Sequence, residues 1–587
     1  MSNAGALMTT AGVTMSFLRS LNYAPKTLLI ASFLIATPML AHAAKPPQNA
    51  IASAHPLATE AGFEILDQGG NAFDAAVAVA GVLSVVEPYS AGMGGGGFWL
   101  LHEGKSGTNV MVDARETAPG AATRDMYLDS AGNVMREWAT SGPTAAAIPG
   151  QPAAFVHMAE RYGRVPLSVS LAPAIRYAEF GFEVDDHYRK MATYARARLN
   201  RYPGARQMFL YQGDIPAVGH LLVQKDLAAT LKLLAEKGRA GFYEGDFAKK
   251  LVETVQADGG IWSLDDLKNY QVKERDPIVG IFRGAKIISA SPPSSGGIVM
   301  LEALTIMDEY QEGDFDPALM PHVTVEAWRR AYFDRARYLG DPDFVTMPVE
   351  GLLSYEYGIQ MGESISETQA TPSQVLGKIS NVNQGDNTTH LSVLDTQGNR
   401  VAATLSINTA FGSGYVAKGT GVLLNNEMDD FSAKPGTGNV YGLVGSEANA
   451  IAPGKRPLSS MTPTFVEWDG NVAILGTPGG SRIISMVMLG VLEALDGKSP
   501  KEWVSRPRFH HQYLPDEVQA EPTFVGSKDA KMLMLRGHKV TSTGRPYGNM
   551  QAIMWNTKTG SVEAASDPRG IGMSLVRVAE PTPAKGK

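Results

Sequence analysis

The sequence changes character at residues 387 and 388. Residues 377–386 form a polar run without hydrophobic periodicity, and the segment 389–395 then alternates apolar and polar side chains as a half-buried strand does. Before this point the patterns are mostly helical, and after it they are mostly those of short strands. We therefore predict an α+β protein in which a helix-rich part, 44–387, precedes a strand-rich part, 388–587. Residues 367–387 are expected to be a flexible linker at the end of the first part.

Periodicity and cap residues place the individual elements. Asn71 precedes an almost wholly apolar segment and is expected to cap a buried helix. That helix is predicted over 72–86, and further helices are predicted over 57–66, 151–162, 165–180, 225–237, 247–258, 298–310, 322–339 and 483–495. Strands are predicted over 98–102, 110–113, 464–468, 472–475, 551–556 and 561–566, with a hairpin formed by 389–395 and 400–407.

Composition excludes several classes of function. The chain has 587 residues, too many for one ordinary core, and no cysteine, which removes thiol catalysis, disulfides and cysteine-ligated zinc. A formal charge of −7 argues against non-specific nucleic-acid binding. His510 and His511 lack a partner histidine at ligand spacing, so we assign them a structural role and predict neither metal nor cofactor.

The N-terminus has the pattern of an export signal. Residues 1–43 contain Arg19 and Lys26 but no acidic residue, an apolar run over 28–40, and a small-x-small end at Ala41-His42-Ala43. The apolar run is short for a membrane span. We expect a cleaved signal peptide and a periplasmic or secreted protein without a membrane span after its removal. A retained N-terminal anchor is the alternative.

The pair Asn387-Thr388 suggests a nucleophile that is activated by cleavage. A threonine hydroxyl needs a base beside it, and a cut before Thr388 would free an α-amine with a pKa of about 7.7–8.0. The cut itself would proceed by attack of the hydroxyl on the Asn387 carbonyl, followed by hydrolysis of the ester. A pair of threonines at the start of a strand is common in sheets and does not by itself indicate a nucleophile.

Polar clusters elsewhere supply the other groups that acyl transfer needs. Arg115 ends a strand, where an arginine is either solvated or a bidentate clamp for a carboxylate. Backbone N–H groups at the start of the helix at 483 suit an oxyanion. Each cluster also has a plain interpretation as a turn or a cap. The clusters are Ser406-Ile407-Asn408, Glu427 to Asp430, Ser459-Ser460 and Gly479-Gly480.

Taken together, these motifs resemble the γ-glutamyltranspeptidase family of N-terminal-nucleophile hydrolases, from about Ala50 to the end of the chain. The motifs that carry the resemblance are 69–72, Gly94 to Phe98, Arg115-Glu116, Pro292 to Gly297, Gly340-Asp341-Pro342, Thr388-Thr389-His390, Leu424 to Phe431, Arg456 to Met461 and Pro478 to Arg482.

The resemblance implies self-cleavage between Asn387 and Thr388 into a large and a small subunit. The two would remain together as a heterodimer in a four-layer αββα sandwich. It also implies a role for each site residue. Thr388 is the nucleophile, and Arg115 holds the substrate α-carboxylate with Ser459 and Ser460. Asp430 binds the α-ammonium, Glu427 and Asn408 are neighbouring contacts, Gly479 and Gly480 form the oxyanion hole, Ser406 stands where relatives carry Thr, and Tyr441 gates a lid over 435–445.

The function implied is transfer of the γ-glutamyl group of glutathione and other γ-glutamyl compounds to water, amino acids or peptides. Two alternatives share the scaffold: a glutaryl-cephalosporin acylase and a poly-γ-glutamate-processing enzyme. A glutaryl group lacks the ammonium that Glu427 and Asp430 would bind, which argues against the acylase. A non-catalytic exported solute-binding protein is an alternative of a different class, and it would need no chain break.

Overall fold

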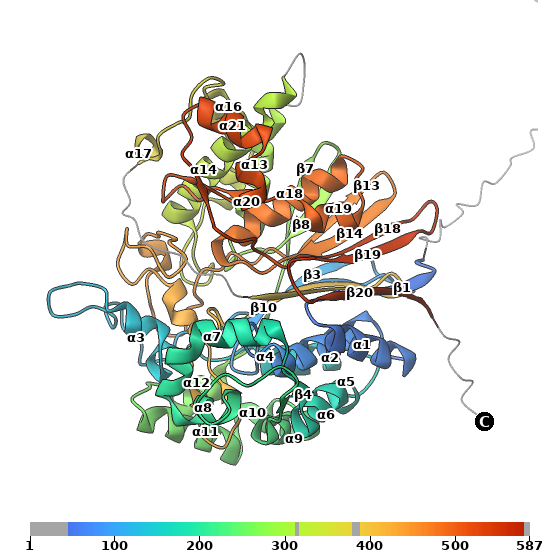
Figure 1. Ribbon diagram of the computed structural model, residues 1–587, viewed down its shortest axis with the longest axis vertical. Coiled ribbons are helices and arrows are strands. Elements are labelled where there is room, and N and C mark those ends of the chain that lie inside the picture. The colour runs from blue at the N-terminus through green and yellow to red at the C-terminus, as the bar shows by residue number, and fades with distance from the viewer. Residues whose placement is uncertain (1–44, 311–315, 378–387, 580–587) are drawn as a thin grey trace, which may run out of the picture. The chain divides into compact units, whose positions relative to one another are not determined.

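Two antiparallel sheets form the centre of the computed structural model, which describes residues 45–310, 316–377 and 388–579 (Figure 1). The first sheet has seven strands in the order β20-β1-β9-β10-β2-β3-β6 and the second has six in the order β19-β18-β14-β13-β8-β7. The first comprises Met573–Val578, Gln48–Ser53, Thr389–Leu394, Arg400–Ser406, Gly96–His102, Asn109–Ala114 and Lys273–Arg275. The second comprises Val562–Ser566, Gln551–Asn556, Asn471–Gly476, Thr464–Trp468, Ala285–Ser289 and Ile278–Phe282.

Each sheet mixes strands from both sides of residue 388. In the first sheet β9 lies between β1 and β10, and in the second β13 pairs with β8. The predicted hairpin of β9 and β10 is confirmed, with Thr389 opposite Leu405. The helix-rich and strand-rich parts of the sequence are therefore interleaved in space and do not form separate domains.

Helices cover the outer faces of the two sheets (Figure 1). Apolar side chains from both sheets fill the space between them. Leu100 and Leu394 of the first sheet share one buried cluster with Phe465 and Ile474 of the second. Helices α1 (Pro56–Asp67) and α2 (Ala72–Val86) pack on the other face of the first sheet, and α13 (Gly296–Asp308), α14 (Met320–Tyr338) and α18 (Ile483–Leu495) belong to the cluster on the second. The fold is thus mixed α+β.

A local prediction about the first sheet is confirmed, and its glycines have a packing role. Asn71 caps α2 in a capping box with Asp74, and every residue of α2 is buried. The glycine run before β2 serves close backbone packing, since a Cβ on Gly94 would lie 2.0 Å from the Leu423 carbonyl oxygen and one on Gly95 would lie 2.1 Å from that of Ser406.

The helical region 151–257 contains the predicted helices and three more. The helices there are α4 (Gln151–Arg161), α5 (Leu167–Ser170), α6 (Ala172–Phe180), α7 (Asp186–Arg201), α8 (Pro203–Phe209), α9 (Lys225–Lys237), α10 (Ala240–Tyr243) and α11 (Gly245–Ala257). Sequence reasoning missed α7 because only four of its sixteen residues are buried, two of them alanines. Its apolar stripe is therefore weak.

The remaining elements are short. The helices are α3 (Arg136–Thr140), α12 (Leu264–Asn269), α15 (Val349–Leu352), α16 (Tyr355–Glu363), α17 (Ser373–Leu376), α19 (Pro500–Ser505), α20 (Pro522–Val525) and α21 (Lys528–Leu535). The strands are β4 (Phe182–Glu183), β5 (Leu221–Leu222), β11 (Val416–Ala417), β12 (Val422–Leu423), β15 (Phe509–His510), β16 (Val518–Ala520) and β17 (Val540–Ser542). No helix within the described residues is long and apolar enough to cross a membrane.

The arginines of α14 are buried: Arg329 and Arg330 pair with Glu326, and Arg335 donates to two serines. Residues 367–377, predicted as part of a flexible linker, are mostly exposed, and two of their backbone N–H groups bind the rest of the protein. The Thr371 N–H donates to Glu326 and the Ser373 N–H to Asp516. The rest of the predicted linker, 378–387, lies outside the described residues.

Candidate functional site

Thr388 immediately precedes β9 and lies between two spaces. It lines a small pocket together with Arg115, Asp430 and Gly480, and it also lines a larger cavity. Its hydroxyl is 3.3 Å from that of Ser406, at the end of the partner strand β10. The Ser406 hydroxyl in turn accepts the Asn408 N–H at 2.8 Å. The hairpin register therefore brings together three of the predicted site residues, while Asn387 lies outside the described residues.

The two residues after Thr388 belong to the core. The Thr389 hydroxyl donates to buried Glu87 at 2.8 Å. The His390 imidazole is fully buried against Thr404, and burial lowers its pKa to about 3. A neutral, hydrogen-bonded imidazole in the core has a structural role, in line with the interpretation of Thr389 and His390 as a continuing strand.

Arg115 is the centre of a buried charge cluster just beyond the end of β3. Its guanidinium lies 3.1 Å from Glu427 and 3.6 Å from Glu116, and it also forms an ion pair with Asp430. Its Nε donates to the Pro457 carbonyl at 3.1 Å. The structure thus brings the predicted carboxylate clamp and the predicted ammonium ligands into direct contact with each other.

Carboxyl groups outnumber the guanidinium in this cluster. Burial raises the pKa of Glu116 to about 7 and that of Glu427 well above its usual range, although Arg115 opposes both shifts. Burial therefore favours the protonated form of Glu427, whereas the neighbouring Arg115 favours its ionised form. A ligand that brings its own positive charge would favour the ionised form.

Ser459 and Ser460 are held by residues from two other elements. The Ser459 carbonyl accepts the backbone N–H and the hydroxyl of Ser295, at 2.9 and 2.7 Å. The Ser460 hydroxyl accepts from Arg335 at 3.2 Å. Ser295 stands at the N-cap position of α13, but its hydroxyl binds the Ser459 carbonyl and makes no cap hydrogen bond.

Arg335 is a site residue that sequence reasoning missed. It is buried beside the cluster, and burial lowers its pKa to about 10. Its helix carries several arginines, and nothing in the local pattern distinguishes this one from a residue on a solvated face.

Gly479 and Gly480 stand at the start of the turn that leads into α18. Both have left-handed φ values, +144° and +56°, which favour glycine. Neither N–H donates a hydrogen bond to another residue in the described part of the chain. Gly480 lines the small pocket with Thr388, and Gly479 lines the larger cavity. Unused donors at this position suit a developing oxyanion.

Tyr441 closes the small pocket. Its hydroxyl donates to the Asn408 carbonyl at 2.7 Å, and its ring lies where a Cβ on Gly480 would approach to 2.4 Å. Asn439, which the sequence did not single out, accepts the Tyr441 N–H and donates to Asp430. The pocket has a volume of about 20 Å³, room for about one water molecule. A ligand there requires the Tyr441 segment and the charge cluster to rearrange.

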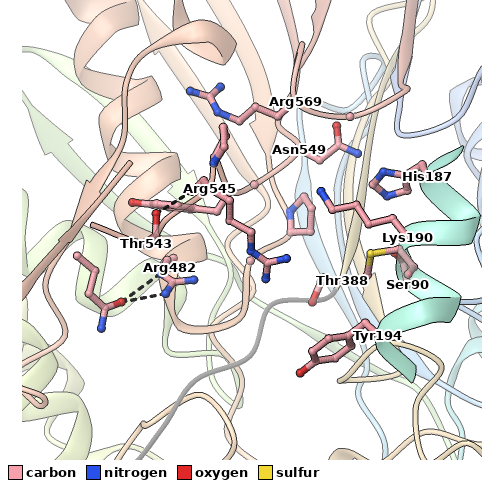
Figure 2. Close-up of a pocket in the computed structure, with 18 of the residues that line it drawn as sticks. Ser90, His187, Lys190, Tyr194, Thr388, Arg482, Thr543, Arg545, Asn549 and Arg569 are labelled. Carbon is pink, nitrogen blue, oxygen red and sulfur yellow. Dashed lines mark hydrogen bonds between the residues drawn. The ribbon is translucent and has the colours of Figure 1, made fainter. Parts of the chain in front are cut away.

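The larger cavity has a volume of about 610 Å³, and Thr388 lies at its edge (Figure 2). Residues of α7, including His187 and Lys190, form one wall. The loop 541–549 and residues 568–570 form the opposite wall. No sequence motif predicted this cavity, because its lining residues are dispersed along the chain.

One group in the described part of the chain has the composition of a metal site: His322, Glu326 and His538. The two imidazoles are hydrogen-bonded to each other at 2.7 Å. Glu326 is paired with Arg329 and Arg330. These ligand atoms are already used within the protein, so we assign the group a structural role. His510 and His511 are fully buried and hydrogen-bonded to Ser485, Gln512 and Asp516.

Comparisons with known proteins converge on one family. A model of the family described as Gamma-glutamyltranspeptidase matches residues 58–576. The chain is 42% identical over 538 residues to the glutathione hydrolase proenzyme of Escherichia coli (strain K12), covering 90% of this chain and 92% of the relative. It is 37% identical to the acylase ACY 1 proenzyme of Pseudomonas sp. (strain V22), covering 89% and 93%. The crystal structure of cephalosporin acylase from Bacillus halodurans matches with a TM-score of 0.79 and 29% identity, covering 96% of this chain and 99% of that one.

Proposed function

This chain belongs to the gamma-glutamyltranspeptidase family, and on that premise we propose that it is a self-cleaving γ-glutamyltransferase and glutathione hydrolase. Its donors are glutathione and other γ-glutamyl compounds, and its acceptors are water, amino acids and peptides. The observation that carries the proposal is the position of Thr388. Thr388 lines both the small pocket, which suits a charged head group, and the larger cavity. A nucleophile in this position would have one part of the substrate in each space.

Activation is cleavage of the bond between Asn387 and Thr388. The Thr388 hydroxyl attacks the Asn387 carbonyl carbon, the peptide C–N bond breaks, and the resulting ester is hydrolysed by water. The products are a carboxyl group on Asn387 and a free α-amine on Thr388. Interleaved strands in both sheets support a heterodimer of 44–387 and 388–587 that stays associated after the cut. They also support the four-layer αββα arrangement of N-terminal-nucleophile hydrolases.

The donor is recognised by its α-amino acid head group. Its carboxylate binds Arg115, Ser459 and Ser460, and its ammonium binds Asp430 and Glu427. In the empty site these opposite charges satisfy one another. A zwitterionic head group replaces that pairing with two new ion pairs. A ligand that lacks either charge leaves a buried charged group without a partner, which is costly.

The transfer follows from the remaining groups. The Thr388 α-amine takes the proton of the hydroxyl, whose oxygen attacks the γ-carbonyl carbon of the donor. The oxyanion accepts hydrogen bonds from Gly479 and Gly480, the C–N bond breaks, and the leaving amine takes the proton. Water or an acceptor amine then attacks the ester, and the Thr388 hydroxyl is regenerated. Ser406 and Asn408 position the nucleophile from the neighbouring strand.

The proposed cellular location rests on the sequence alone. We place the enzyme in the periplasm or outside the cell, with residues 1–43 removed as a signal peptide. The basic, apolar and small-residue pattern of that segment supports this.

A denaturing gel and two anilide substrates test the proposal. The purified protein should run as two pieces, one with Thr388 at its N-terminus. It should hydrolyse γ-glutamyl-4-nitroanilide at least about 100-fold faster, in kcat/KM, than glutaryl-4-nitroanilide, which lacks only the ammonium. An uncut chain of full mature mass would falsify the activation step, and a preference for the glutaryl substrate would favour the acylase.

A further inference from the structure

The cavity beyond Thr388 is separate from the head-group pocket and large enough for a further ligand. Its volume of about 610 Å³ lies within the range of small-molecule sites, about 300–1,000 Å³. Thr388 lines both spaces. Whatever occupies the cavity therefore lies next to the nucleophile, opposite the head group of the donor.

Three of the five basic residues that line the cavity offer no free positive charge to a ligand, because two bind other residues of the protein and one is neutral. Arg569 pairs with Glu521 at 2.6 Å and with Asp567 at 3.1 Å. Arg482 donates to Gln519 at 3.0 Å and lies over the Tyr547 ring. Burial lowers the pKa of His187, which is therefore neutral at neutral pH.

The two acids of the lining are also engaged. Glu87 accepts the Thr389 hydroxyl at 2.8 Å, and burial raises its pKa to about 7. Glu517 pairs with Lys539 at 3.0 Å and accepts from Thr541. Neither carboxylate neutralises a cation of the cavity.

Lys190 and Arg545 are the remaining cations. Both are exposed, and neither side chain forms an ion pair or hydrogen bond with any residue in the described ranges. Lys190 extends into the cavity from α7, and Arg545 extends from the loop on the opposite wall, on either side of the space above Thr388 (Figure 2). An anion between the two side chains would be attracted by both charges.

We propose that Lys190 and Arg545 bind the carboxylate of the amine that leaves or accepts the γ-glutamyl group. The cavity then selects free amino acids and short peptides with an unblocked C-terminus over neutral amines. This rests on the proposed function and adds the two residues that would hold the carboxylate of the second substrate. The reacting nitrogen lies at Thr388 and the carboxylate lies further into the cavity, between the two cations.

Two donors that differ by one carboxylate test the assignment. The ratio of kcat/KM for γ-glutamyl-3-carboxy-4-nitroanilide to that for γ-glutamyl-4-nitroanilide should exceed unity in the native enzyme. Lys190→Met and Arg545→Met should each lower the ratio by about 2- to 10-fold, and the double variant by more. Lys225→Met and Arg196→Met remove exposed cations outside the cavity and should leave the ratio unchanged.

A second measurement requires no variant. Raising the ionic strength from about 0.01 M to about 0.5 M should lower the native ratio, because partly exposed charge pairs are screened. Transfer to glycylglycine should likewise exceed transfer to glycylglycine amide in the native enzyme and lose that advantage in the double variant.

The outcomes separate the two proposals. If the native enzyme hydrolyses both anilides but the double variant keeps the native ratio, the carboxylate assignment is wrong and the proposed function stands. A native ratio that does not respond to salt also contradicts the assignment. If the native enzyme hydrolyses neither anilide, the proposed function fails and the assignment fails with it.

Discussion

The two spaces that meet at Thr388 differ in how their charges are arranged. In the head-group pocket Arg115, Glu427 and Asp430 are buried and already paired with one another. In the cavity Lys190 and Arg545 are exposed and unpaired with any described residue. Buried pairs make a mismatched ligand costly, whereas exposed charges are screened by solvent and contribute little each. The pocket should therefore be strict about the donor, and the cavity should be tolerant of the acceptor.

Removal of the hydroxyl of Thr388, the residue that lines both spaces, should have the largest effect on activity. Thr388→Ala lacks the hydroxyl that attacks Asn387 and the donor, so self-cleavage should stop. Activity should fall by at least about 10³–10⁴-fold, measured as γ-glutamyl-4-nitroanilide hydrolysis. Thr388→Ser keeps a hydroxyl and should still be cut. A fully cleaved, active Thr388→Ala protein would remove Thr388 from both steps.

Removal of Arg115 from the buried charge cluster should weaken donor binding and leave self-cleavage intact. Arg115→Ala leaves Glu427 and Asp430 without their cation and the donor carboxylate without its clamp, so the donor KM should rise by about 10²–10³-fold. Two bands on a denaturing gel should persist, because Arg115 does not act in the cut. If the variant remains a single chain, the role assigned to Arg115 is wrong.

The glycine turn should be sensitive to a single methyl group. In Gly480→Ala the new Cβ would meet the Tyr441 ring at 2.4 Å, on a backbone with φ of +56°. Displacement of the oxyanion donor should lower kcat by about 10- to 100-fold. Gly454→Ala is the matched control, because Gly454 has φ of +73° with open space around its Cβ position. Equal losses of kcat in both variants would indicate backbone strain instead of a blocked site.

The hydrogen bond from the Tyr441 hydroxyl to the Asn408 carbonyl should help to close the pocket. Tyr441→Phe keeps the ring over Gly480 but loses the bond to the Asn408 carbonyl. The donor KM should rise by about 2- to 10-fold with kcat little changed. The ratio of kcat/KM for γ-glutamyl-3-carboxy-4-nitroanilide to that for γ-glutamyl-4-nitroanilide should not change. A change in that ratio would show that the two spaces are coupled through this segment.

The smallest expected effect is a change in pH dependence. Burial raises the pKa of Glu427, and the donor ammonium favours its ionised form. Donor binding therefore releases a proton, and the donor KM should fall as pH rises through the pKa of Glu427 in the empty enzyme. Glu427→Gln cannot titrate, so the change in KM between about pH 6 and 9 should be smaller by about 2- to 5-fold. An unchanged KM profile would exclude Glu427 as the titrating group.

Much of the fold was predictable because its signals are local. The capping box at Asn71, the hairpin of β9 and β10, and the apolar helix α18 each depend on residues within one or two turns of one another. The hairpin register alone placed Ser406 beside Thr388. Helix α7 was missed because most of its side chains are exposed.

The candidate site was predictable in its residues but not in its contacts. Arg335 and Asn439 have no local signal, since a charged residue on a helix and an asparagine in a loop are ordinary. Their importance comes from hydrogen bonds to Ser460 and Asp430. The pairing of Arg115 with Asp430 joins residues 315 positions apart.

The sequence by itself determined which strand follows Thr388, the nucleophile that we propose, and which serine stands beside it. The strand and its pairing depend on side-chain alternation and turn propensity, which act over a few residues. Only the tertiary structure decided that the clamp residues neutralise one another in the empty pocket, and that Lys190 and Arg545 enter one cavity from opposite walls. Those contacts depend on how two interleaved sheets and their helices pack, and packing is set by the whole chain at once.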